Sequence, residues 1–234
     1  MNHNINNSLS NESVLGVVLA GGLSSRMGQD KAQLQRDNVG SSLSMLDFSK
    51  QLLIDSGISN IVISGDNHQV ADRIKNTGPV GGIHSVLQYC LSKQTQPKAL
   101  LILPVDLPLM TSAMLSELRL KGELSQKATF FKETSGKEHY IPLYLPNNAY
   151  LELFLANTFK AISSQSHSPQ SSSRQGEPLQ VAPLQGKSAQ KSGKNGPSIR
   201  ALLQHIPHQS INATGSVLFN SNTPQEWQQA KQYF

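Results

Sequence analysis

The sequence predicts an α/β fold with a doubly wound, mostly parallel sheet. Short apolar runs typical of buried strands alternate with longer segments of helical periodicity along most of the chain. The first apolar run, Val14–Leu19, leads directly into a glycine-rich turn. With 234 residues, the chain is long enough to bury the core of one domain of ordinary size.

The elements follow from the periodicity of the apolar residues. We expect strands at Val14–Leu19, Ile58–Ser64, Leu100–Leu103, Ala128–Phe131, His139–Leu145 and Val217–Phe219. We expect helices at Leu46–Asp55, Gly82–Leu91, Ser112–Leu120, Asn148–Phe159 and Ser198–His205. A last helix should begin at Thr223–Glu226, where a capping residue precedes a proline and an acidic residue follows three positions after the cap.

Two polar segments interrupt this pattern. Residues 1–13 are rich in Asn and Ser, and we interpret them as a polar N-terminal tail before a single domain at 14–234. Residues 163–197 contain Ser, Gln, Gly, Lys and Pro at almost every position, so burial cannot offset the entropy of ordering them. They are expected to form a long surface insertion. A loop without function is the simpler interpretation, and a lid beside an active site is the alternative.

Composition and charge limit the classes of function. The net charge of +5 suits anionic ligands. Lys and Arg are spread along the chain without interleaved aromatic residues, so nucleic acid is not expected and phosphorylated small molecules explain the charge. The single cysteine, Cys90, excludes an internal disulfide. No apolar run reaches membrane-spanning length, so we expect a cytoplasmic protein without membrane contact.

The turn after the first strand predicts phosphate binding. Gly21 and Gly22 let backbone N–H groups approach an anion without interference from a Cβ atom, and Arg26 and Lys31 add positive charge. The segment is not a Walker A loop, because no Gly-Lys-Ser/Thr ends it, and it lacks the Gly-x-Gly-x-x-Gly spacing of dinucleotide folds. We therefore interpret it as a nucleotide-handling loop.

Asp106 is the candidate metal ligand. It follows the strand expected at Leu100–Leu103 and lies between two prolines, in Pro104–Pro108. Ligands of open α/β sheets bind at the carboxyl ends of strands, and Mg²⁺ needs few protein ligands because it keeps several waters. The alternative interpretation is a turn-forming aspartate beside proline.

Two further segments contain candidate binding residues. Asp72 precedes a turn-rich passage that begins with Gly78 and Pro79. Near the end of the chain, Asn220 and Asn222 stand at alternate positions of an expected strand end, so both amides should point the same way. A turn before the last helix is the alternative for Asn222.

The sequences of these segments resemble those of the molybdenum cofactor guanylyltransferases, which belong to the MobA-like nucleotidyltransferases. The Ala-Gly-Gly of the first loop, the Arg-Met-Gly and Lys31 after it, Pro-Val-Asp-Leu-Pro, Gly-Pro-Val-Gly-Gly and Asn-Ser-Asn-Thr-Pro are all similar to family segments. The resemblance implies a Rossmann-like nucleotidyltransferase fold. It also implies transfer of GMP from GTP to the molybdopterin form of the molybdenum cofactor, with Mg²⁺ as cofactor and possible handover to proteins that mature molybdoenzymes.

The resemblance also implies roles for individual residues. Arg26, Lys31 and Asp106 would be catalytic, with Asp106 holding the metal. Nucleotide-binding residues would be Leu19, Ala20, Gly21, Gly22, Lys31, Ser64, Asp72, Gly78, Pro79 and Asp106. Acceptor-binding residues would be Asn220, Asn222 and Arg200.

The chain departs from the family pattern at two positions. Ser64 stands where the family often has Asn, and the segment from Arg36 to Ser41 lacks a lysine that usually precedes the next helix. Three alternatives therefore stay open: a cytidylyltransferase for the same cofactor, a sugar-phosphate nucleotidyltransferase of the same fold, and a nucleotide-binding relative without catalysis.

Overall fold

The computed structural model describes residues 13–21, 30–38, 41–165 and 196–234. The polar tail predicted at 1–13 and the insertion predicted at 163–197 lie mostly outside these residues. Gly22 and Arg26 also lie outside the described residues. The division into one domain with an insertion therefore stays a prediction.

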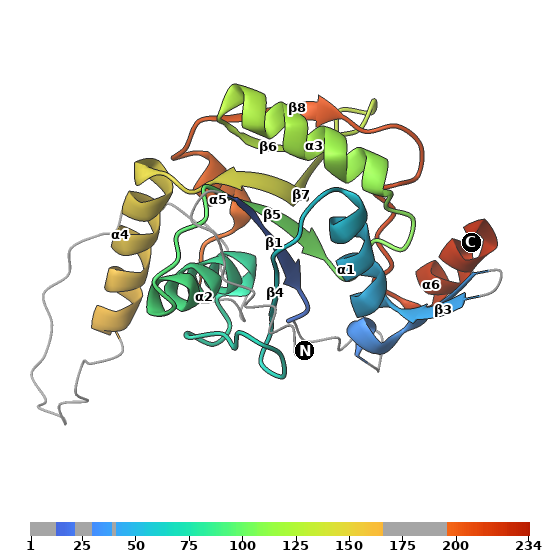
Figure 1. Cartoon of the computed structure of the whole chain (residues 1–234), viewed down its shortest axis with the longest axis horizontal. Helices are drawn as coiled ribbons and strands as arrows, with labels where there is room; N and C mark the ends of the chain where they lie inside the picture. Colours follow the sequence, from blue (N-terminus) through green and yellow to red (C-terminus); the bar gives the residue numbers. More distant parts are fainter. Residues whose placement is uncertain (1–12, 22–29, 39–40, 166–195) are drawn as a thin grey trace, which may run out of the picture.

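A six-stranded mixed sheet forms the centre of the molecule (Figure 1). In spatial order, its strands are β4 (Ile61–Ser64), β1 (Val14–Leu19), β5 (Ala99–Pro104), β7 (Glu138–Pro146), β6 (Ala128–Lys132) and β8 (His208–Asn212). β1 is parallel to both β4 and β5, and β6 is parallel to β8. Only β7 is antiparallel to its two neighbours, β5 and β6. The predicted α/β fold with a mostly parallel sheet is confirmed.

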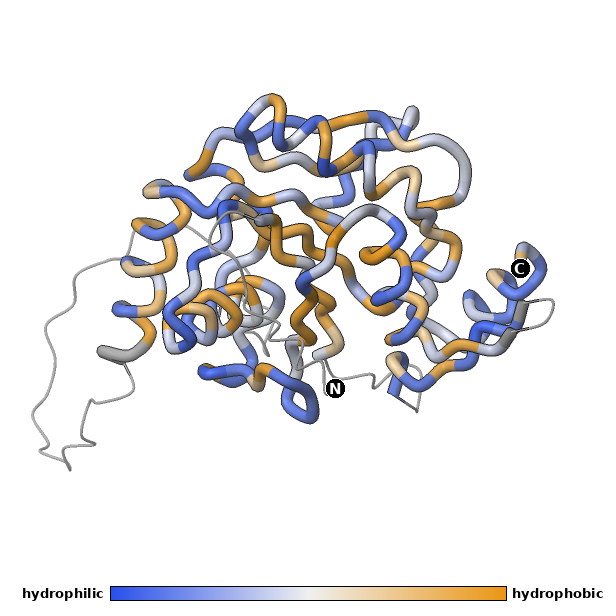
Figure 2. Tube along the Cα trace, in the orientation of Figure 1, coloured by the Kyte–Doolittle hydropathy of each residue, from blue (hydrophilic) through white to orange (hydrophobic). Residues whose placement is uncertain are grey.

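Helices cover both faces of this sheet (Figure 1). One face carries α2 (Gly78–Ser92), α4 (Ala149–Gln165) and α5 (Ile199–Leu203), and the other carries α1 (Met45–Asp55) and α3 (Ser112–Ser125). Successive strand residues point to opposite faces, so Val17 joins the core under α2 whereas Val18 joins the core under α1 and α3. The strongly apolar tube of the central strands in Figure 2 reflects burial on both sides.

A smaller unit lies at one end of the molecule, beside α1 (Figure 1). It consists of η1 (Lys31–Gln33), a hairpin of β2 (Gln35–Asn38) and β3 (Ser41–Ser44), α6 (Pro224–Ala230) and η2 (Lys231–Tyr233). Leu34, Met45 and Trp227 form its own buried cluster. The sequence did not predict the hairpin, because its strands are polar and show no apolar alternation.

Three predicted elements need correction. Val217–Phe219 is a turn and not a strand, because Leu218 is buried against the core beneath α3 instead of extending the sheet. The edge strand beside β6 is β8, which is mostly polar because it lies at the margin of the sheet. β4 begins at Ile61 and not at Ile58, and α2 begins at Gly78, before the predicted start at Gly82.

Among the residues that the structure describes, no helix is both long enough and apolar enough to span a membrane.

Gly122 offers a test of the packing of α3 on the sheet. A Cβ atom at this position would lie 2.1 Å from the ring of Tyr144 in β7. Overpacking a buried ring costs about 1–3 kcal/mol, and we expect that cost to exceed the roughly 1 kcal/mol that alanine gains in a helix. Gly122→Ala should therefore lower the free energy of unfolding measured in urea. Leu124→Ala, at an exposed position of α3, is the control. Equal stability of the two variants would contradict this packing.

Candidate active site at the carboxyl ends of the parallel strands

The candidate site lies where β1, β4 and β5 end. Leu19, the last residue of β1, pairs with Ser64 of β4 on one side and with Pro104 of β5 on the other. Gly21 then passes so close to the backbone of Gly65 that a Cβ atom would lie 3.3 Å from the Gly65 Cα atom. The residues following three strands therefore meet at one edge, where open α/β sheets bind ligands.

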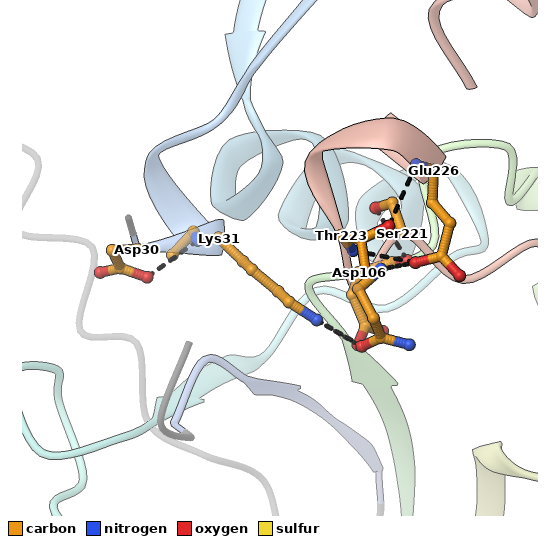
Figure 3. A network of polar contacts seen from close by, with 8 residues as sticks. Asp30, Lys31, Asp106, Ser221, Thr223 and Glu226 are labelled. Atoms are coloured by element: carbon orange, nitrogen blue, oxygen red, sulfur yellow. Dashed lines mark hydrogen bonds and ion pairs between the residues drawn. The ribbon is translucent and has the colours of Figure 1, made fainter. Parts of the chain in front are cut away.

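Lys31, Asp106 and Asn222 form the polar centre of this edge, and Figure 3 shows Lys31 and Asp106 pointing toward each other. Lys31 Nζ donates to Asn222 Oδ1 at 2.6 Å and lies 3.3 Å from Asp106 Oδ2. The Lys31 and Asp106 side chains are only 16% and 19% exposed. The structure thus joins three residues that the sequence singled out separately, and it places an ammonium group between a carboxylate and an amide.

Backbone hydrogen bonds hold this centre in place (Figure 3). The N–H of Ser221 donates to the carbonyl oxygen of Asp106 at 3.0 Å. Glu226 Oε2 accepts from the N–H groups of Asn222 at 2.7 Å and Thr223 at 2.8 Å, while the Thr223 hydroxyl caps α6 by accepting from the N–H of Glu226. The predicted helix start is therefore a complete capping box that also fixes the backbone of Asn222.

One oxygen of Asp106 is available for a further ligand. Within the described ranges, Asp106 Oδ1 is buried and has no hydrogen-bond partner. An unpaired buried carboxylate oxygen is costly, so this atom fits a cation that is added with the substrate. Carboxylate and amide oxygens are ligands that Mg²⁺ accepts. The described residues contain no group of three or more His, Cys, Asp or Glu side chains that could hold a metal ion, so most ligands would have to be water or substrate oxygens.

A second group of predicted residues surrounds Gly82 of α2. A Cβ atom on Gly82 would lie 3.1 Å from Ser64 Oγ, 3.2 Å from Leu19 Cδ2 and 3.9 Å from Asp72 Oδ1. Leu19, Ser64 and Asp72 therefore gather closely around Gly82. In this surrounding, burial raises the pKa of Asp72 above its ordinary value, and the Asp66 carboxylate raises it further, while Lys75 opposes both.

The start of α2 borders this second group. Gly78 has a φ of 65°, a left-handed conformation that favours glycine. The hydroxyl of Thr77, the N-cap residue, donates to the carbonyl oxygen of Ile74 at 2.7 Å and does not cap the helix. The first turn of α2 therefore has no hydrogen bond from its N-cap side chain. Pro79 has no N–H and suits the first turn.

Two candidate residues do not join the centre. Asn220 is exposed, and the segment before α6 is not a strand. The expectation that the Asn220 and Asn222 amides point the same way assumed a strand, so it no longer applies. Arg200 is exposed in α5, near Tyr140 of β7, whose pKa it lowers slightly against the larger raising effect of Glu138. Sequence analysis missed the role of Glu226 in holding Asn222, although the capping pattern itself was visible.

Comparison with known proteins assigns the family. The profile of the MobA-like NTP transferase domain matches residues 16–179, and the chain belongs to this family. Over 106 residues, it is 40% identical to a protein named molybdenum cofactor guanylyltransferase from Xanthomonas euvesicatoria pv. vesicatoria (strain 85-10). That match covers 44% of this chain and 52% of the relative, so the chain spans about half the length of that protein.

Solved structures share the fold at low identity. Molybdopterin-guanine dinucleotide biosynthesis protein A from Archaeoglobus fulgidus superposes with a TM-score of 0.60 at 15% identity, over 94% of this chain and 98% of that one. A Mycobacterium tuberculosis protein crystallised with manganese gives a TM-score of 0.52 at 12% identity, over 95% of this chain and 100% of that one. These likenesses show the nucleotidyltransferase-like fold.

Glu226→Gln tests the link between the capping box and the site. The hydrogen bond from the N–H of Asn222 is the largest influence on the pKa of Glu226 and lowers it. Desolvation opposes this, and hydrogen bonds from Thr223 lower the pKa further, so it lies below the ordinary value of a glutamate. A carboxyl group whose pKa is lower in the folded than in the unfolded protein stabilises the fold at pH values above its unfolded-state pKa. This stabilisation is lost as the pH falls through the folded-state pKa.

We therefore expect Glu226→Gln to be less stable than the parent protein at about pH 7, with the difference shrinking on acidification. Urea unfolding at a series of pH values measures this. Glu117→Gln, at an exposed position of α3, is the matched control. The same pH dependence in both variants would show that the capping carboxylate contributes nothing specific.

Proposed function

We propose that this chain transfers GMP from GTP to the terminal phosphate of the molybdopterin form of the molybdenum cofactor and releases pyrophosphate. The contact of Lys31 with Asp106 and Asn222, beside the group around Gly82, carries this proposal. Membership of the MobA-like family supports nucleotidyl transfer, and the partial relative from Xanthomonas supports the choice of substrates.

The chemistry requires few protein groups. A phosphate oxygen of the acceptor attacks the α-phosphorus of GTP and forms a new P–O bond. The bond between the α-phosphorus and the oxygen that bridges to the β-phosphate breaks, and pyrophosphate takes that electron pair. The acceptor brings its own nucleophile, so the protein has to align the two phosphates and compensate their charge.

Lys31 would compensate this charge directly, and Asp106 would do so through the cation that it holds. Lys31 would turn its ammonium group toward the triphosphate, supported by Arg26 and by the N–H groups of Gly21 and Gly22. Asp106 would hold Mg²⁺ through Oδ1, which is buried and unpaired among the described residues. When bound, Mg²⁺ would neutralise negative charge on the reacting phosphate oxygens.

The group around Gly82 would receive the guanine base. Guanine presents its N1–H and its amino group together, and a carboxylate accepts both, so Asp72 is the residue that can distinguish it from adenine. Leu19 and Ala20 would lie along the nucleotide. Ser64, Gly78 and Pro79 would complete this side of the pocket. Burial around Asp72 strengthens any hydrogen bond that its carboxylate makes.

The acceptor would bind nearer the C-terminal segment. Asn222 lies beside Lys31 and Asp106, where the acceptor phosphate must arrive. Asn220 and Arg200 are the outer candidates for contacts with the pterin substrate. Handover of the product to proteins that mature molybdoenzymes would follow from the same reaction.

Ser64 keeps other substrates as alternatives. It is a buried residue beside Asp72, at a position where the family often has Asn. A cytidylyltransferase or a sugar-phosphate nucleotidyltransferase would use the same phosphate chemistry with a different base or acceptor contact. Pyrophosphate release with GTP, CTP and ATP, each with Mg²⁺ and molybdopterin, separates these enzymes from each other and from a relative that binds nucleotide without turnover.

Asp106→Asn tests the assignment of the metal ligand. The amide keeps the shape of the side chain but loses the charge that would hold Mg²⁺. We expect metal-dependent pyrophosphate release to fall at least about 100-fold, the scale on which removing one group that stabilises the transition state acts. Circular dichroism should show an unchanged fold. Near-normal turnover that still requires Mg²⁺ would place the metal ligand elsewhere.

Asp72→Asn tests the choice of base. A buried hydrogen bond that is left unpaired costs about 1–3 kcal/mol, so the ratio of kcat/KM for GTP over ATP should narrow. Because the pKa of Asp72 is raised, the KM for GTP in the parent protein should begin to rise on acidification at a higher pH than an ordinary aspartate would cause.

Asp66→Asn is the matched control for this prediction. Asp66 is a neighbouring exposed carboxylate that pairs with Lys75 at 2.6 Å. Its removal should leave the GTP preference at neutral pH unchanged. Because the Asp66 charge helps to raise the pKa of Asp72, its removal should also make the KM for GTP begin to rise at a lower pH than in the parent protein. An unchanged GTP-to-ATP ratio in Asp72→Asn would assign base recognition to the backbone.

A further inference from the structure

Arg36 of β2 connects the hairpin to the loop that carries Asp106. Arg36 Nε donates a hydrogen bond to the carbonyl oxygen of Pro108 at 2.9 Å. Pro108 is buried and lies two residues beyond Asp106 in the turn after β5. Sequence analysis treated Arg36 only as part of a segment that departs from the family pattern.

Two aromatic rings pack against the guanidinium group of Arg36. Its Cζ atom lies 4.3 Å from the ring centre of Phe48 in α1 and 4.5 Å from the ring centre of Phe234. A planar guanidinium group can stack between two rings, whereas the compact and strongly hydrated ammonium group of lysine cannot. Burial lowers the pKa of Arg36, and the group stays charged because an arginine pKa starts far above neutral pH.

The contacts of Arg36 are made with backbone and with aromatic rings. Its guanidinium group contacts two aromatic rings, and its Nε atom donates to the carbonyl oxygen of Pro108. The guanidinium group therefore holds the backbone of the loop after β5.

The loop around Asp106 is anchored from two directions. Arg36 holds the carbonyl oxygen of Pro108, and the N–H of Ser221 holds the carbonyl oxygen of Asp106 itself. Because Asp106 Oδ1 has no partner among the described residues, these backbone anchors and the Lys31 contact set the direction of the carboxylate.

We propose that Arg36 is a positioning residue that orients Asp106 for binding a divalent cation. The inference rests on the proposed function only in assigning the metal to Asp106. It predicts that Arg36 affects metal affinity although it touches neither metal nor substrate. Mutation of residues that orient a metal ligand without touching the metal typically lowers metal affinity by about 10–100-fold.

Titration with Mn²⁺, followed by the electron paramagnetic resonance signal of the free ion, tests this inference with and without GTP. We expect Arg36→Lys to raise the dissociation constant for Mn²⁺ about tenfold or more. Phe234→Leu keeps the arginine and removes one ring, so it should weaken binding in the same direction by a smaller factor. That variant also replaces Arg36→Lys as the test if the latter does not fold.

Two controls separate positioning from general stability. Lys231→Ala removes an exposed ion pair, 3.7 Å from Lys231 Nζ to Asp37 Oδ2, that joins η2 to the same hairpin. Gly122→Ala destabilises α3, which lies on the sheet and not in the hairpin unit. Neither should change Mn²⁺ affinity. Parent-like affinity in Arg36→Lys or Phe234→Leu, or an equal loss in Gly122→Ala, would overturn the inference.

The same titration distinguishes this inference from the proposed function. Loss of Mn²⁺ binding in Asp106→Asn and weakened binding in Arg36→Lys, without turnover of GTP in the parent protein, would sustain the role of Arg36 and refute the proposed reaction. Undiminished Mn²⁺ binding in Asp106→Asn would refute the assumption on which the role of Arg36 rests.

Discussion

The parallel pairing of β1 with both β4 and β5 decides where the candidate site residues lie. Three adjacent strands that run in the same direction must end at the same edge, and Leu19 is paired with Ser64 and Pro104 at that edge. The loops that follow these strands carry Lys31, Asp72 and Asp106. The topology of the sheet thus brings together groups whose side chains have no local reason to meet.

Charge balance explains why the centre is built around Lys31. An ammonium group and a carboxylate that are both largely buried must stay paired, because either one alone would lose its hydration without compensation. A triphosphate that enters this edge brings further negative charge next to Asp106. Under the proposed function, Lys31 alone cannot serve both Asp106 and the phosphates, and this is the physical reason for a divalent cation between them.

The fold was predictable to the extent that burial decides it. β1 and β5 are buried on both faces, so their apolar runs were visible. β8 was missed because an edge strand needs few apolar residues, and Val217–Phe219 was misread because apolar residues that pack under α3 resemble a strand. Periodicity reports which residues are buried, and it reports backbone shape only indirectly.

The site was predictable residue by residue but not as an arrangement. Lys31 is separated from Asp106 by 75 positions and from Asn222 by 191, so no local pattern could show that the three side chains touch. Neither could a sequence pattern show that Glu226 holds Asn222 as well as capping its helix. The contact of Lys31 with Asn222 requires the segment before α6 to lie beside η1, and the polar sequence of β2 and β3 gave no reason to expect a packed unit there.

The hairpin explains how the chain can differ from the family pattern between Arg36 and Ser41. The short polar strands β2 and β3 carry few apolar side chains that could be buried. Their position therefore depends on the buried cluster of Leu34, Met45 and Trp227 and on the contacts of the Arg36 guanidinium group with two aromatic rings. Arg36 contacts the Phe48 and Phe234 rings and the carbonyl oxygen of Pro108. Within the described residues, the positive charge beside Asp106 therefore comes from Lys31, and the hairpin contributes through geometry.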